Sequence, residues 1–71
     1  GLTFEELFHT YYGSLCRFAF TLVNSTEAAE EIVSDVFLKV WRNKENLVIK
    51  SSLQSYLFTS VRNQSIDYLR K

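Results

Sequence analysis

The sequence predicts a small all-α domain, a bundle of three helices. The 71 residues contain no Pro and only two Gly, one of them Gly1, so little in the chain interrupts helix formation. Apolar residues recur at helical spacing in three separate segments. The connections between these segments are short, which is typical of bundles whose consecutive helices pack side by side.

The first helix is expected to begin after Thr3, because Thr3 and Glu6 have the spacing of a capping box. Apolar residues then keep helical spacing for about five turns; they are Phe4, Leu7, Phe8, Tyr11, Leu15, Phe18, Ala19 and Leu22. The polar segment 24–26 interrupts this pattern. It offers caps for the second helix, and Asn24 with Glu27 fits a second capping box.

The second helix is expected to end near Asn43. Its core stripe is widened at the C-terminal end by two aromatic residues and consists of Ala29, Ile32, Val33, Val36, Val40, Phe37 and Trp41. Leu38 lies about 180° from this stripe at the helical 100° per residue. A single exposed leucine is ordinary. The alternative is a docking face for a basic partner helix, in which acidic and hydrogen-bonding groups surround an apolar anchor.

Residues 43–52 are predicted to form a loop in which Leu47, Val48 and Ile49 turn back toward the core. Ser51 or Ser52 is the expected N-cap of a third helix over residues 53–71. One side of this helix is expected to face the core, and it carries Leu57, Val61 and Tyr68. The other edge carries Tyr56, Thr59, Asn63 and Arg70, three of which recur every seven residues in a stripe about 20 Å long.

The polar edge of the third helix offers an aromatic ring, an amide and guanidinium groups, which can stack on a base, hydrogen-bond its edge and hold phosphate. Charge supports nucleic-acid binding, because residues 37–71 contain seven of the eight bases, whereas residues 1–36 contain six acids and only Arg17. A purely structural interpretation is also open. Asp67 could pair with Lys71, Asn63 could be a solvated polar residue, and Tyr56 could lie at the edge of the core.

The composition argues against an enzyme and against a metal or other cofactor. His9 and Cys16 are the only soft ligands, too few for a structural zinc site. They are also about 10 Å apart along one helix, too far for a nucleophile and its base. The sequence has no apolar run of roughly 20 residues that could span a bilayer. A lone thiol is typical of the reducing cytoplasm, which is the expected location.

Two segments carry a resemblance to a known family: EEIVSDVFLKVWR at residues 30–42 and YLFTSVRNQSIDYLR at residues 56–70. Their order and the length of chain between them resemble the second region of bacterial sigma factors, in particular the extracytoplasmic-function (ECF) group. The similarity covers essentially the whole chain, 1–71. It implies a transcription initiation domain that binds RNA polymerase and that recognises and melts the minus-ten element of promoters.

The resemblance also implies which residues bind each partner. The second helix would dock on the coiled coil of the largest-subunit clamp of RNA polymerase through Glu31, Ser34, Asp35, Leu38 and Arg42. The third helix and the preceding loop would hold the single-stranded non-template strand, including a flipped base, through Lys50, Ser51, Ser52, Tyr56, Asn63, Arg62 and Arg70. Thr59 borders the stripe of Tyr56, Asn63 and Arg70 and is added to the predicted DNA-binding residues from its position. An anti-sigma factor is a further expected partner.

Three positions and one domain depart from the family pattern. Tyr56 stands where Trp is common, and Ser34 stands where the longer Gln is common. Gln64 falls on the core stripe and is expected to reach a backbone group between two helices. The helix-turn-helix domain of the family, which reads the minus-thirty-five element, is absent from this chain. A helical protein-interaction domain without direct DNA contact, such as one that binds an anti-sigma factor, remains the alternative.

Overall fold

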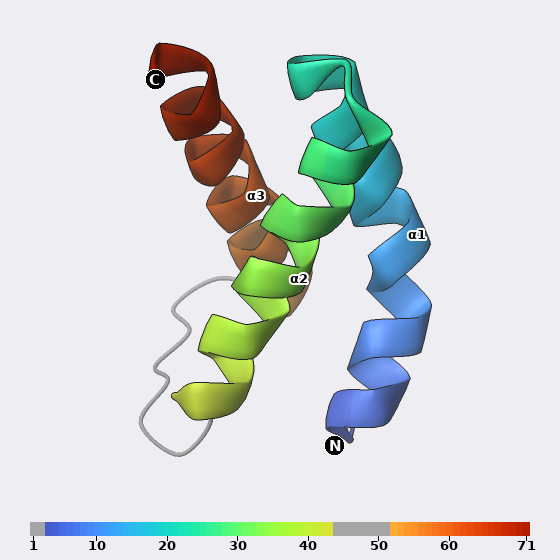
Figure 1. Ribbon diagram of the computed structural model, residues 1–71. Helices are drawn as coiled ribbons and strands as arrows, with labels where there is room; N and C mark the ends of the chain where they lie inside the picture. Colours follow the sequence, from blue (N-terminus) through green and yellow to red (C-terminus); the bar gives the residue numbers. More distant parts are fainter. Residues whose placement is uncertain (1–2, 44–51) are drawn as a thin grey trace.

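The protein folds as three helices. The computed structural model describes residues 3–43 and 52–71, and all regular structure in these two ranges is helical. The helices are α1 (Phe4–Val23), α2 (Thr26–Arg42) and α3 (Leu53–Arg70). α2 runs back beside α1, and α3 returns in the opposite direction to α2 (Figure 1). Each helix packs against the other two, so the predicted all-α bundle is confirmed.

The start of α1 is capped as predicted. The Thr3 hydroxyl accepts a hydrogen bond from the Glu6 backbone N–H at 3.2 Å, and the two side chains also meet at 3.1 Å. At the start of α3, Ser52 accepts from the Ser55 N–H at 3.1 Å, which decides between the two predicted caps. The predicted inward turn of Leu47, Val48 and Ile49 lies outside the described residues.

The turn between α1 and α2 differs from the prediction. Asn24 is in the left-handed region, with φ 54° and ψ 37°, and its N–H donates to the Phe20 carbonyl at 2.8 Å. Asn24 therefore ends α1, as residues that tolerate this conformation commonly do. Ser25 is extended and accepts from the Ala28 N–H at 3.2 Å. Of the caps that segment 24–26 offers, Ser25 is the one used. The predicted box of Asn24 with Glu27 is wrong, because Asn24 closes α1 before α2 begins.

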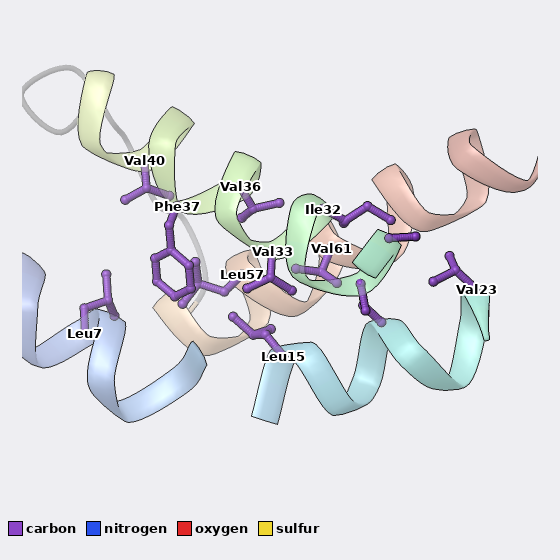
Figure 2. Close-up of a cluster of buried hydrophobic side chains, with 13 residues drawn as sticks. Leu7, Leu15, Val23, Ile32, Val33, Val36, Phe37, Val40, Leu57 and Val61 are labelled. Carbon is purple, nitrogen blue, oxygen red and sulfur yellow. The ribbon is translucent and has the colours of Figure 1, made fainter. Parts of the chain in front are cut away.

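The core lies where the three helices meet (Figure 2). The predicted stripe of α2 is buried except at Trp41, and Phe37 is the largest of the fully buried side chains. Leu15 of α1 and Leu57 of α3 are completely enclosed beside it. Aromatic rings close one end of this core: the Phe8 centroid is 5.0 Å from that of Phe37 and 4.7 Å from that of Tyr12.

Three residues occupy positions that periodicity did not predict. Trp41 is 47% exposed and packs edge-on against Phe4, with ring centroids 4.9 Å apart, at the rim of the core. Tyr68, predicted to face the core, is 45% exposed. Ser65 is fully buried instead. Helical spacing gives the direction of a side chain but not whether a neighbouring helix extends far enough to cover it. No described helix is both long and apolar enough to cross a membrane.

Candidate docking and nucleic-acid surfaces

Leu38 is exposed on α2, as predicted, with 43% of its surface accessible. Together with Ser34, one turn earlier, it forms a ridge between two shallow grooves, because both residues line each groove. We call Ser34 and Leu38 the α2 ridge. A leucine that protrudes between two grooves differs from an isolated surface leucine, because a partner that fills both grooves can enclose its side chain from both sides.

The first groove lies between α2 and α3 and has a volume of about 640 Å³. Four of the five residues predicted to bind polymerase line it, namely Glu31, Ser34, Asp35 and Leu38, whereas Arg42 does not. The opposite wall comes from the C-terminal end of the chain and consists of Gln64, Asp67, Tyr68 and Lys71. Helical periodicity could not predict this wall, because it depends on how α3 crosses α2.

The second groove lies between the start of α1 and the end of α2 and has a volume of about 720 Å³. Its floor is mainly aromatic, with Phe4, Phe8, Phe37 and Trp41 among its lining residues. Thr3 and Glu5 form a polar edge. The candidate docking surface is therefore apolar toward α1 and charged toward α3, with the α2 ridge between the two halves.

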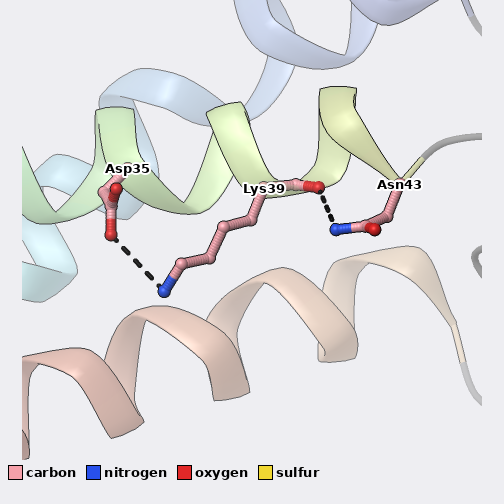
Figure 3. A network of polar contacts seen from close by, with 3 residues as sticks. All are labelled: Asp35, Lys39 and Asn43. Atoms are coloured by element: carbon pink, nitrogen blue, oxygen red, sulfur yellow. Dashed lines mark hydrogen bonds and ion pairs between the residues drawn. The ribbon is translucent and has the colours of Figure 1, made fainter.

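A polar network joins the docking face to α3. The Lys39 ammonium lies 3.5 Å from the Asp35 carboxylate, one turn away on the same helix (Figure 3). In the amide orientation that suits both neighbours, Gln64 donates to Asp35 Oδ2 and accepts from Lys39 Nζ, each at 3.0 Å. The expectation that Gln64 reaches a backbone group is wrong, because its partners are these two side chains. The described residues show no ion pair between Asp67 and Lys71.

The candidate nucleic-acid face contains a smaller pocket of about 240 Å³ between α2 and α3. Tyr56 and Asn63, which the sequence places on one stripe, both line it. Ser60 lies between them on the same helix, and Lys39 closes the pocket from α2. The spacing of Ser60 from Tyr56 and Asn63 could have identified it, since residues three and four apart share a helix face. The inclusion of Lys39 depends on tertiary structure.

The remaining predicted nucleic-acid residues surround this pocket less closely. Arg62 Nη1 donates to Asn63 Oδ1 at 3.4 Å, so a guanidinium lies beside the amide. Thr59 and Arg70 are exposed but do not line the pocket. Ser52 is exposed and its hydroxyl is occupied in capping α3. Lys50 and Ser51 lie outside the described residues.

Cys16 and Tyr12 form a separate polar contact on α1. Burial raises the pKa of the Cys16 thiol, hydrogen bonding to Tyr12 offsets part of this shift, and Glu30 adds to it. Burial also raises the pKa of Tyr12, which a hydrogen bond with Ser34 partly offsets. The thiolate is the reactive form of cysteine, so a raised pKa makes Cys16 a poor nucleophile at neutral pH.

These raised pKa values predict a loss of stability in alkaline solution. Both groups hold their protons more tightly in the folded chain, so the free energy of unfolding falls as pH rises past about 8.5, where an unfolded thiol ionises. Urea unfolding at pH 7 to 10 measures this decline. Cys16→Ala should remove the part of this decline that begins at the lower pH, because a thiol ionises at a lower pH than a tyrosine hydroxyl. An identical pH profile for the variant would show that the thiol contributes nothing.

In the part of the chain that the structure describes, no three His, Cys, Asp or Glu side chains are close enough together to hold a metal ion. His9 is exposed and lies edge-on to its neighbour Phe8, with ring centroids 5.9 Å apart.

Sequence comparisons with known proteins show the family of the chain. The chain belongs to the Sigma-70 region 2 family, which it matches over residues 7–71. It is 29% identical over 69 residues to the ECF RNA polymerase sigma factor SigX of Bacillus subtilis, and 26% identical over 70 residues to SigM of the same organism. It is 35% identical over 57 residues to a probable RNA polymerase sigma factor of Haemophilus influenzae.

These alignments cover 97%, 99% and 80% of the chain but only 36%, 42% and 29% of the respective relatives. The chain therefore spans less than half the length of the curated relatives it matches. No solved structure matches it. The prediction of a region 2 domain of the ECF sigma-factor type is confirmed. The chain is thus a domain of transcription initiation factors, a regulatory class of proteins.

Proposed function

We propose that this domain docks on the largest-subunit clamp of RNA polymerase and holds the single-stranded non-template strand of the promoter minus-ten element. The observation that carries the proposal is the presence of two chemically different surfaces on one small bundle. The α2 ridge is an apolar anchor beside acids. The pocket of Tyr56 and Asn63 combines an aromatic ring, an amide and a nearby cation.

The α2 ridge supports the docking half of the proposal through its shape and charge. A hot spot is typically an apolar group at the centre of a contact, with polar groups around it that exclude water. Leu38 can fill that central role, and Glu31 and Asp35 supply acids that complement a basic partner helix. Arg42 is exposed at the end of α2 and would contact the partner outside the groove.

The small pocket supports the DNA half through its size and chemistry. Its volume of about 240 Å³ is below the range of about 300–1,000 Å³ typical of ligand sites, so it suits one base rather than a whole nucleotide. Flipping a base costs a few kcal/mol of unstacking. Tyr56 can return part of this by stacking, and Asn63 can hydrogen-bond the base edge. Arg62 and Arg70 are exposed cations for the backbone, and Thr59 is an exposed hydroxyl.

The DNA half is tested by fluorescence titration of labelled oligonucleotides. The domain should prefer single-stranded non-template sequence over duplex and bind more weakly as salt increases. Asn63→Ala should cost about 1–3 kcal/mol on the preferred base and little on others, because an amide that contacts a base edge carries sequence information. Arg70→Ala should weaken all sequences equally and reduce the salt slope by about 0.7, the contribution of one phosphate contact.

Each result has a defined contrary outcome. If Asn63→Ala loses the same affinity for every oligonucleotide, Asn63 contacts the sugar-phosphate backbone of DNA and not a base. If it loses no affinity, Asn63 is a solvated helix residue. If no variant or condition shows binding to single strands, the domain is a protein-interaction module without direct DNA contact. In that case an anti-sigma factor or the polymerase itself would be its only partner.

We also propose that the domain works as part of a longer sigma factor. A helix-turn-helix domain in the remainder of that protein would read the minus-thirty-five element. The domain by itself would then recognise the minus-ten element weakly and direct transcription inefficiently. Binding to RNA polymerase would place its action in the cytoplasm, and an anti-sigma factor that covers the α2 ridge would block it.

A further inference from the structure

Lys39 lies at the boundary between the two proposed surfaces. It lines both the groove below the α2 ridge and the small pocket of Tyr56 and Asn63. Gln64 is the other residue that lines both. Figure 3 shows the Lys39 side chain extending from α2 toward α3. A single lysine therefore reaches the polymerase-docking side and the DNA side of the domain.

The Lys39 ammonium is engaged on the docking side. Asp35 lies 3.5 Å away, and the Gln64 amide oxygen accepts from Nζ at 3.0 Å. The same Gln64 amide donates to Asp35, so the amide holds acid and base in one network. The Lys39 and Asp35 side chains remain 57% and 48% exposed, and ion pairs with this exposure are weak and easily exchanged.

A basic partner would change this balance. Asp35 is one of the acids predicted to meet the polymerase clamp, and a carboxylate that pairs with a partner cation no longer neutralises Lys39. The ammonium is on a flexible four-carbon stem and is a compact point charge suited to phosphate. It already lines the pocket in which Tyr56 and Asn63 would hold a base, so a nearby DNA phosphate is within its range.

We infer that Lys39 is a further DNA-binding residue, which Asp35 withholds in the free domain and releases when a basic partner pairs with Asp35. The inference rests on the proposed function and adds a link between its two halves. Docking on polymerase would then increase affinity for the non-template strand without any rearrangement of the helices. Gln64 is the positioning residue, because it holds the two charges in the resting arrangement.

The test removes the Asp35 carboxylate by mutation, which should free Lys39 as pairing of Asp35 with a basic partner would. Titrations of the 71-residue domain with a labelled single-stranded minus-ten oligonucleotide compare the wild type with Asp35→Asn, Lys39→Gln and the double variant. Asp35→Asn should strengthen binding about two- to fivefold, the usual worth of an exposed ion pair. It should also steepen the salt slope by about 0.7, since one more phosphate is neutralised. In the Lys39→Gln background, Asp35→Asn should change the affinity and the salt slope only as much as the removal of any nearby negative charge does.

Asp67→Asn is the matched control for that general effect. Asp67 lines the same groove, undergoes the same chemical change and forms no ion pair with Lys39 in the described structure. It should raise affinity slightly and by the same factor with or without Lys39. A double-mutant cycle separates this additive contribution from coupling between Asp35 and Lys39.

The outcomes separate the inference from the proposed function. If Asp35→Asn behaves like Asp67→Asn and its effect does not depend on Lys39, the inference is wrong. The DNA half of the proposed function then still stands if Asn63→Ala weakens binding to the preferred base. If no variant binds single strands, Asp35→Asn included, both are wrong. Thermal unfolding of each variant confirms that binding is compared among folded proteins.

Discussion

Phe37→Ala is expected to lower the free energy of unfolding by about 3–5 kcal/mol, the usual cost of removing a buried aromatic ring. Phe37 is 2% exposed and is the largest of the fully buried side chains. Its ring meets those of Phe4, Phe8 and Tyr12 with centroids 5.0–6.4 Å apart, so the variant leaves a cavity that rigid neighbours cannot fill. Domains are typically stable by only about 5–15 kcal/mol, so this loss would leave a large unfolded fraction.

The adjacent residue gives the matched control. Leu38→Ala should change the free energy of unfolding by no more than about 0.5 kcal/mol, because the Leu38 side chain is 43% exposed on the surface of α2. Urea unfolding followed by circular dichroism measures both variants under the same conditions. A large loss for Leu38→Ala would place that leucine in the core and remove the basis for a docking surface. A small loss for Phe37→Ala would contradict the packing of the aromatic end of the bundle.

Leu38→Asp combined with Asp35→Arg is expected to abolish binding to the polymerase clamp. The first change puts a charge where an apolar anchor is proposed, and hot-spot residues of this kind contribute about 2 kcal/mol or more. The second change sets a like charge against a basic partner helix. Both side chains are exposed, so thermal unfolding should stay nearly unchanged. Titration of the labelled domain with an isolated clamp fragment measures the loss.

A control one turn before the α2 ridge separates docking from net charge. Glu30→Arg makes the same change of charge as Asp35→Arg, but Glu30 lines a hollow with Cys16 and Phe20 and neither of the two grooves beside the α2 ridge. It should leave clamp binding within about twofold, as expected for a rim or remote charge. Equal losses for Asp35→Arg alone and for Glu30→Arg would mean that clamp binding responds to overall charge and not to the α2 ridge.

The candidate sites were predictable where they depend on one helix. Leu38 opposes the core stripe of α2, and Tyr56 and Asn63 share a stripe of α3, because helical periodicity fixes the direction of each side chain. Periodicity could not place Asp67, Tyr68 and Lys71 on the groove between α2 and α3. Nor could it show that Gln64 joins Asp35 to Lys39. Those contacts depend on the crossing of α2 and α3, which is decided by packing between helices.

The sequence by itself determined three helices, most of their core residues and two of their caps. These features follow from local spacing and from hydrogen bonds within a few residues, as at Thr3 and Glu6. Tertiary structure decided the rest. Tyr68 is exposed and Ser65 is buried because only some turns of α3 are covered by neighbouring helices. Lys39 reaches both surfaces for the same reason. The partners of a side chain depend on which other helix lies within its range, and the local sequence does not determine the distance between two helices.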